Sequence, residues 1–97
     1  MSTFIALVNF TDQGIKNIKE SPKRAKAFQD LAKKSGCTVR ELYWTQGQYD
    51  LVTIVEAPDE KTMSALMLTV ASLGNIRGQP LRAFSAAEFG AIIKKMG

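Results

Sequence analysis

The spacing of apolar residues changes several times along the chain, and each change marks a new predicted element. Short runs that are continuously apolar, or that alternate with polar residues, predict strands, whereas apolar residues at steps of three and four predict helices. The predicted order is strand, helix, strand, strand, helix, strand, followed by a short C-terminal helix. These elements are expected over residues 4–10, 21–35, 37–45, 49–56, 60–73, 76–84 and 86–95.

Polar residues and a glycine stand where the predicted helices begin and end. Ser21 is expected to cap the first helix, with Pro22 at its first helical position. Gly36 can adopt the left-handed conformation that commonly ends a helix. Asp59 and Ser85 are expected to cap the second long helix and the C-terminal helix. The helical segments are therefore bounded by residues suited to those positions.

This order of elements predicts an α+β domain, a ferredoxin-like βαββαβ sandwich with a short additional C-terminal helix. Both long helices are expected on one face of a four-stranded antiparallel sheet. Pro80 cannot donate a ladder hydrogen bond, which places the last strand at an edge of that sheet. The chain shows no linker and no low-complexity run, so residues 1–97 are expected to form a single domain.

The first and third predicted strands are apolar on both faces, although an antiparallel sheet with one face in water should alternate. Aliphatic side chains follow one another almost without polar breaks in residues 5–8 and 51–55. Four or five such side chains left in water would forgo about 1.5–3 kcal/mol each. We therefore expect the free face to be covered, either by the C-terminal helix or by the sheet of a second copy. The second alternative predicts a homodimer, or a higher even-numbered oligomer, that closes a two-chain barrel.

The composition excludes several kinds of catalytic and metal site. The 97 residues include no histidine and one cysteine, Cys37. The usual zinc sites and catalytic Ser-His-Asp or Cys-His groups are therefore excluded, and no cofactor is expected. One cysteine cannot form an internal disulfide, and residues 1–8 indicate a strand, not a signal peptide. No apolar stretch reaches the roughly 18 residues of a membrane span, so the expected location is cytoplasmic.

The net charge of +4 comes largely from basic residues between positions 16 and 34. Glu20 and Asp30 interrupt that run, which favours a solvated helix face over a nucleic-acid patch. RNA-recognition domains share the βαββαβ order, but they stack bases on aromatic residues of the third strand within a pattern that also contains basic residues. Residues 46–51 contain one aromatic residue, Tyr49, and no basic residue. The sequence thus argues against nucleic-acid binding.

The sequence Gly47-Gln48-Tyr49-Asp50 resembles the signature of the GYD domain family, a group of small, largely uncharacterised proteins. Further stretches carry the likeness in order, from Thr3 to about Phe84. They are residues 9–15, 21–22, 43–45, 55–59, 73–77 and 81–84. The resemblance implies a ferredoxin-like fold of the dimeric α/β-barrel kind, and it implies no established catalytic activity.

Five residues are the candidate ligand-binding residues: Tyr43, Trp44, Tyr49 and Asp50 around the predicted hairpin, and Arg82 in the last strand. In the functional interpretation, an aromatic wall and one carboxylate stand at the mouth of an apolar pocket, and the arginine binds an anion. In the structural alternative, Trp44 lies in the core and Asp50 holds the amides of the turn, while Arg82 forms an ion pair or faces water.

Two functions of different classes remain after these exclusions. The first is a small-molecule-binding or interaction module without catalysis, which the lack of a recognisable catalytic group favours. The alternative is a small cofactor-independent enzyme of the dimeric α/β-barrel type, an oxygenase or an isomerase, with an aromatic-lined pocket. That alternative rests on analogy of fold alone, and the sequence leaves open whether the protein is an enzyme. The expected partners are a second copy of the chain and a small-molecule ligand.

Overall fold

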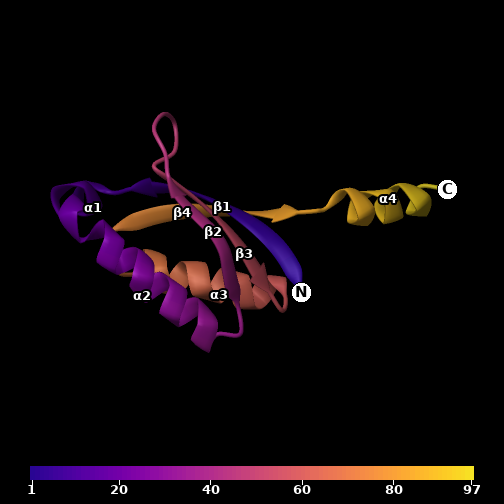
Figure 1. Ribbon diagram of the computed structural model, residues 1–97, viewed down its shortest axis with the longest axis horizontal. Coiled ribbons are helices and arrows are strands. Elements are labelled where there is room, and N and C mark those ends of the chain that lie inside the picture. The colour runs from indigo at the N-terminus through magenta and orange to yellow at the C-terminus, as the bar shows by residue number, and fades with distance from the viewer.

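The computed structural model describes residues 1–97 and contains the predicted succession of strands and helices (Figure 1). A short helix and a 3₁₀ turn precede the first long helix. The elements are β1 (Ser2–Phe10), α1 (Asp12–Lys16), the turn η1 (Ile18–Glu20), α2 (Ser21–Lys34), β2 (Thr38–Trp44), β3 (Leu51–Ala57), α3 (Glu60–Ala71), β4 (Ile76–Ala83) and α4 (Ala86–Lys95).

The four strands form one antiparallel sheet in the order β2-β3-β1-β4, which confirms the ferredoxin-like arrangement. The two strands with nearly continuous apolar sequences, β1 and β3, occupy its centre, with a neighbouring strand on each side. Strand β4 lies at an edge, as Pro80 predicted. The register places Ile5 of β1 opposite Ile54 of β3 on one side and Leu81 of β4 on the other.

Helices α2 and α3 cover one face of the sheet, and the core lies between them and the strands (Figure 1). Alternate residues of β3 are buried there, because successive side chains of a strand point to opposite faces. The buried core consists of Phe4, Ala6, Val8, Ala32, Cys37, Leu51, Val55, Ala57, Met63, Leu66 and Met67. The remaining face of the sheet has no helix against it.

Three of the predicted helix boundaries are confirmed. The side chain of Asp59 accepts a hydrogen bond from the Thr62 amide at 2.7 Å and caps α3. Ser85 and Glu88 form a capping box at the start of α4, in which each side chain accepts from the other residue's amide. Gly36 has a φ of 81°, the left-handed conformation expected between α2 and β2.

The start of α2 differs from the prediction. Ser21 is itself helical, with φ −55° and ψ −42°, and the cap position falls on Glu20. The chain enters α2 directly from the turn η1, so the Ser21 hydroxyl does not cap the helix. It accepts a hydrogen bond from Nε1 of Trp44 at 3.0 Å instead. Pro22 does occupy the first turn, as predicted.

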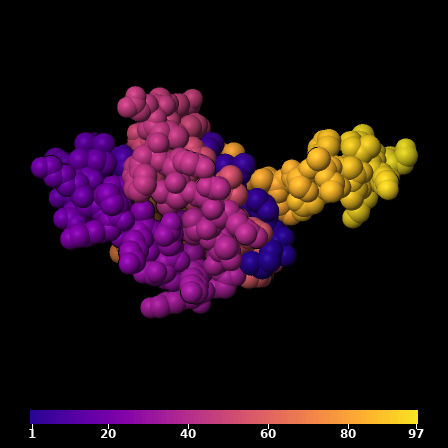
Figure 2. All heavy atoms as spheres, in the orientation of Figure 1, coloured from indigo at the N-terminus to yellow at the C-terminus, as the bar shows by residue number.

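Helix α4 extends away from the sheet and packs on neither of its faces (Figures 1 and 2). The molecule is consequently elongated, with principal extents of 51 × 31 × 19 Å. Phe89, Ile93 and Met96 are 55%, 48% and 77% exposed. The C-terminal helix was one of the two covers expected for the free face of the sheet. Within its own chain, α4 does not cover that face. Neither α4 nor any other helix has the length and apolar character that crossing a membrane requires.

Candidate functional site

The face of the sheet opposite α2 and α3, called the outer face below, is apolar at its centre. Its apolar residues are Ile5, Leu7, Tyr43, Val52, Ile54 and Leu81. Leu7 lies opposite Val52, and Val52 lies opposite Tyr43, so the apolar side chains are contiguous across three strands. Tyr43 and Leu81 are 55% and 40% exposed. A contiguous exposed apolar patch of this kind is typical of an interaction surface.

An ion pair borders the outer face. Arg40 of β2 donates hydrogen bonds to both carboxylate oxygens of Glu56 on β3. This hydrogen-bonded guanidinium lowers the pKa of Glu56 below the ordinary glutamate value. Glu56 is therefore ionised near neutral pH.

Tyr43 and Trp44 lie on opposite faces of the sheet. The Tyr43 hydroxyl, on the outer face, donates to Oε2 of Glu41 at 2.8 Å, and this bond to a carboxylate raises the tyrosine pKa. Trp44 lies on the helix-covered face, where its indole N–H reaches Ser21 of α2. The Trp44 residue is 49% exposed, so it covers the start of α2 without entering the core.

Asp50 fastens the β2–β3 hairpin to the end of β1. Its carboxylate accepts the Phe10 amide at 2.8 Å, and its own amide donates to the Val8 carbonyl at 2.9 Å. Within the hairpin, the Thr45 hydroxyl donates to the Tyr49 carbonyl at 2.6 Å, and the Thr45 amide donates to the Asp50 carbonyl at 2.8 Å. The Asp50 carboxylate thus holds an amide of β1 and not an amide of the turn, and Asp50 links the hairpin to the central strand.

Arg82 orients the segment that leads into α4. Its Nη1 donates to the main-chain carbonyls of Thr3, at 3.2 Å, and of Ala83. The guanidinium lies 4.4 Å from the ring centroid of Phe84, and Nη2 lies 3.7 Å from the Glu88 carboxylate in the first turn of α4. Arg82 thus contacts both ends of the connection between β4 and α4.

The five candidate residues are not gathered at one place. Asp50 lies beside Phe10 at one end of β1, whereas Arg82 pairs with Phe4, about 20 Å away along the strand at ~3.3 Å per residue. Tyr43 faces away from Trp44, and only Tyr49 and Asp50 share the loop between β2 and β3. Their roles in ligand binding stay predictions.

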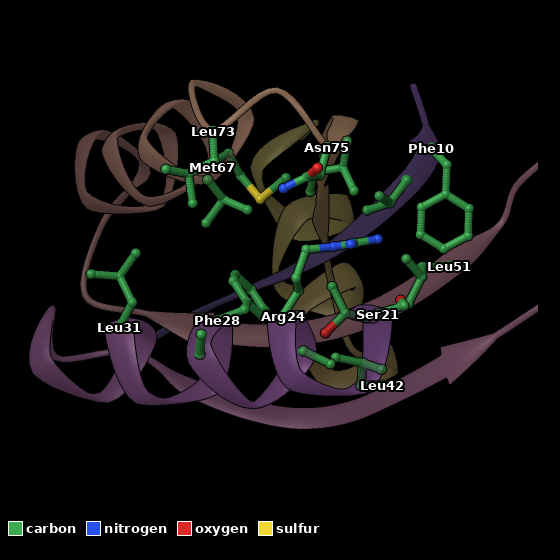
Figure 3. A pocket seen from close by; sticks show the side chains of 16 residues that line it. Phe10, Ser21, Arg24, Phe28, Leu31, Leu42, Leu51, Met67, Leu73 and Asn75 are labelled. Atoms are coloured by element: carbon green, nitrogen blue, oxygen red, sulfur yellow. The ribbon is translucent and has the colours of Figure 1, made fainter. Parts of the chain in front are cut away.

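An apolar cavity lies between the helices and the sheet, and none of the five candidate residues lines it. Its volume is about 220 Å³, and 12 of the 16 residues around it are hydrophobic. Figure 3 shows side chains converging on it from α2, from the end of α3 and from the strands. Among the residues that line it are Phe10, Phe28, Leu31, Leu51, Met67 and Ile76.

Met67 forms an adjustable part of the cavity wall because of the glycine opposite it. A Cβ atom added to Gly78 of β4 would lie 2.3 Å from the terminal methyl of Met67. The methyl group therefore occupies the space that a side chain at position 78 would take. Methionine is unbranched and flexible, so this methyl group can move at small cost.

One charged residue, Arg24, lines the cavity. It comes from α2, and Figure 3 shows its side chain extending across the cavity toward Phe10. Nη1 donates to the Asn17 carbonyl at 2.9 Å and Nη2 to the Gly14 carbonyl at 3.3 Å. None of the ion pairs of the protein includes Arg24. The guanidinium is thus held by main-chain oxygens and has no acidic partner.

The position of Arg24 at the cavity could have been predicted from its spacing along α2. Arg24, Phe28 and Leu31 are spaced at four and three residues, so they share one helix face. Arg24 therefore differs from the other basic residues of positions 16–34, because it lies in line with the apolar residues of α2.

Other reactive groups lie outside the cavity lining. Cys37 is buried, and burial raises the pKa of its thiol. No group of three or more acidic or thiol side chains is arranged to hold a metal ion. The notable features are therefore an apolar outer face, an exposed apolar helix and a cavity with one guanidinium.

A family model described as the GYD domain matches residues 4–93. The chain belongs to the GYD domain family. This confirms the resemblance, and the match continues into α4, beyond the stretches on which the resemblance was based. The match thus runs from β1 into the C-terminal helix.

Two similar proteins of known sequence or structure come from Thermus thermophilus. One is 37% identical over 95 residues, which cover 97% of this GYD chain and all of the relative. That protein is named glutamine synthetase and cystathionine beta-lyase binding protein. The other is a solved crystal structure with a TM-score of 0.57 and 25% identity, covering 89% of this chain and 96% of that one. It supports the α+β fold described above.

Proposed function

We propose that this GYD domain is a non-catalytic interaction module that pairs with a second copy through the outer face and binds other proteins. The contiguous apolar outer face is the observation that carries the proposal. The relative named for binding two enzymes supports an interaction role, because it is similar over the full length of both chains.

A second copy is a suitable cover for the outer face. Two identical apolar faces are self-complementary when a two-fold axis relates them. The centre of the face is aliphatic, and the Arg40–Glu56 pair stands at its border, where it can stay in contact with water. This arrangement of an apolar centre and a polar rim is common in protein interfaces.

The size of the sheet suggests that α4 also takes part. Four strands of about seven residues give a flat footprint of roughly 19 by 23 Å, or about 440 Å². Standard interfaces bury about 800 Å² on each partner. The exposed apolar side of α4, with Phe89, Ile93 and Met96, can supply further area. In the proposed pair, α4 of each copy packs against the other copy.

The pairing is tested by sedimentation velocity on the wild type, on Leu7→Glu and on Leu68→Glu. Leu7 lies in the outer face, and Leu68 is 71% exposed on α3, on the other side of the molecule. We expect an even-numbered oligomer for the wild type and for Leu68→Glu, and a folded monomer for Leu7→Glu. A wild type that stays monomeric at micromolar concentration would remove the pairing.

Binding to other proteins is tested with purified glutamine synthetase and cystathionine beta-lyase of the organism that produces this chain. The basic residues of α2, for example Lys23 and Lys26, lie on the side of the molecule away from the outer face. They therefore stay accessible to another protein in a sheet-to-sheet pair. We expect the wild type to bind at least one of the two enzymes in biolayer interferometry. If the wild type binds neither enzyme, the part of the proposal that rests on the Thermus thermophilus relative is refuted. The proposed pairing is unaffected by that result.

A further inference from the structure

The cavity between α2, α3 and the sheet has no part in the proposed pairing, because it opens on the helix-covered side. Two residues of its lining are exposed: Ala27 on α2 and Leu73 just after α3. A ligand can therefore enter between these two helices. We propose that the cavity binds a small monocarboxylate with an apolar body, and that the carboxylate pairs with Arg24.

The volume limits the apolar body of the ligand. At about 30 Å³ for each water-sized group, 220 Å³ holds roughly seven carbon-sized groups. An apolar protein cavity of about 150 Å³ is known to admit benzene, so this cavity is large enough for a small ligand. A medium-chain fatty acid such as octanoate fits this limit, and long-chain lipids exceed it.

The charge determines which end group is favoured. Arg24 is the one charged residue of the lining, and no acidic side chain opposes it. Two of its N–H groups are used by the carbonyl oxygens of Asn17 and Gly14, which hold the guanidinium in position. The remaining N–H donors can bind a carboxylate, and arginine binds carboxylates with two parallel hydrogen bonds. An ammonium group would be repelled at the same place.

The other polar groups of the lining do not require a polar ligand. The Ser21 hydroxyl accepts from Trp44, and the Thr53 hydroxyl donates to the Glu41 carbonyl at 2.8 Å. Asn75 lies across the cavity from α2, and its Oδ1 accepts from Gln13 at 2.9 Å (Figure 3). The group that Asn75 can offer a ligand is its amide nitrogen, a second donor. Arg24 and Asn75 thus each bring side-chain N–H donors to the cavity, which suits an anion.

The test is calorimetric titration of the purified protein with octanoate, octanol and octylamine, which share one chain and differ in charge. The single tryptophan gives a second readout, because Trp44 bonds to Ser21 in the cavity wall. The variants are Arg24→Met and, as a matched control, Lys33→Met on an exposed position of the same helix. Octanol measures whether the apolar cavity is intact in each variant.

We expect the wild type to bind octanoate more tightly than octanol and to bind octylamine least. Arg24→Met should weaken octanoate about tenfold or more, the effect of one charge-assisted hydrogen bond, and leave octanol nearly unchanged. Lys33→Met should alter neither. If Arg24→Met does not fold, Arg24→Lys, which keeps the charge, should still prefer octanoate to octanol. Equal affinities of the wild type for octanoate and octanol, or no binding at millimolar ligand, would overturn the proposal.

Discussion

Replacing Gly14 by alanine tests the contact that holds α1 against the turn after α3. An added Cβ would lie 2.0 Å from the main-chain oxygen of Asn75 and 3.0 Å from its carbonyl carbon. That oxygen also accepts the Thr11 amide at 3.1 Å, so the substitution clashes with the acceptor of an existing hydrogen bond. Because both partners are backbone, neither can rotate away, and one segment must shift by about 1 Å to restore the 3.0 Å that Cβ contacts require.

The magnitude follows from two terms. Forced overpacking costs about 1–3 kcal/mol, and the loss of one main-chain hydrogen bond adds about 1 kcal/mol. We therefore expect Gly14→Ala to lower the free energy of unfolding by about 2–4 kcal/mol. At about 4–8 °C per kcal/mol for a domain of this size, Tm should fall by roughly 8–32 °C.

The assay is thermal unfolding followed by far-ultraviolet circular dichroism at one fixed protein concentration, because pairing would make Tm depend on concentration. Gly90→Ala is the matched control. Position 90 is exposed within α4, has no neighbouring atom within 4 Å of an added Cβ, and alanine favours the helix by about 1 kcal/mol. The control should unfold at or slightly above the wild-type Tm. If Gly14→Ala unfolds within about 2 °C of the wild type, α1 moves freely and the contact is not rigid.

Three further predictions concern individual side chains. Ser21→Ala removes the acceptor of the Trp44 indole, so tryptophan emission should shift and stability should fall by about 1 kcal/mol; unchanged emission would contradict the bond. Ser85→Ala removes the cap of α4 and should lower its helix content at a cost of about 1 kcal/mol, measured from α4 chemical shifts. Since Arg40 lowers the pKa of Glu56, the pair should stabilise the fold above the ordinary glutamate pKa and lose that effect as pH falls through the lowered value. In an NMR titration the Glu56 midpoint should rise in Arg40→Ala, and an unchanged midpoint would refute the assigned cause.

Features that depend on local chemistry could be predicted from the sequence. Asp59 and Ser85 cap their helices because each has a free amide three residues ahead, which is a local condition. The central position of β1 and β3 followed from their apolar residues on both faces. Ser21 could not be assigned correctly in this way, since its actual partner, Trp44, lies 23 residues away in the chain.

The candidate site shows a different limit. Tyr43 and Trp44 are adjacent in one strand, so they had to point to opposite faces and could not line the same pocket on one side of the sheet. The distance between Arg82 and Asp50 depends on the register of β1 against β4, which the sequence alone does not determine. The cavity forms where α2, α3 and the strands meet, and no single segment of the sequence contains it.

The contact of Met67 with Gly78 has a consequence for how such domains could diversify. A side chain at position 78 would displace the flexible methyl group of Met67, not a rigid backbone, and push it into the cavity. One added methyl group on an edge strand would therefore shorten the longest acyl chain that can enter. Ligand length could then change between related domains by a single substitution, while both helices, the arginine and the pairing face stay as they are.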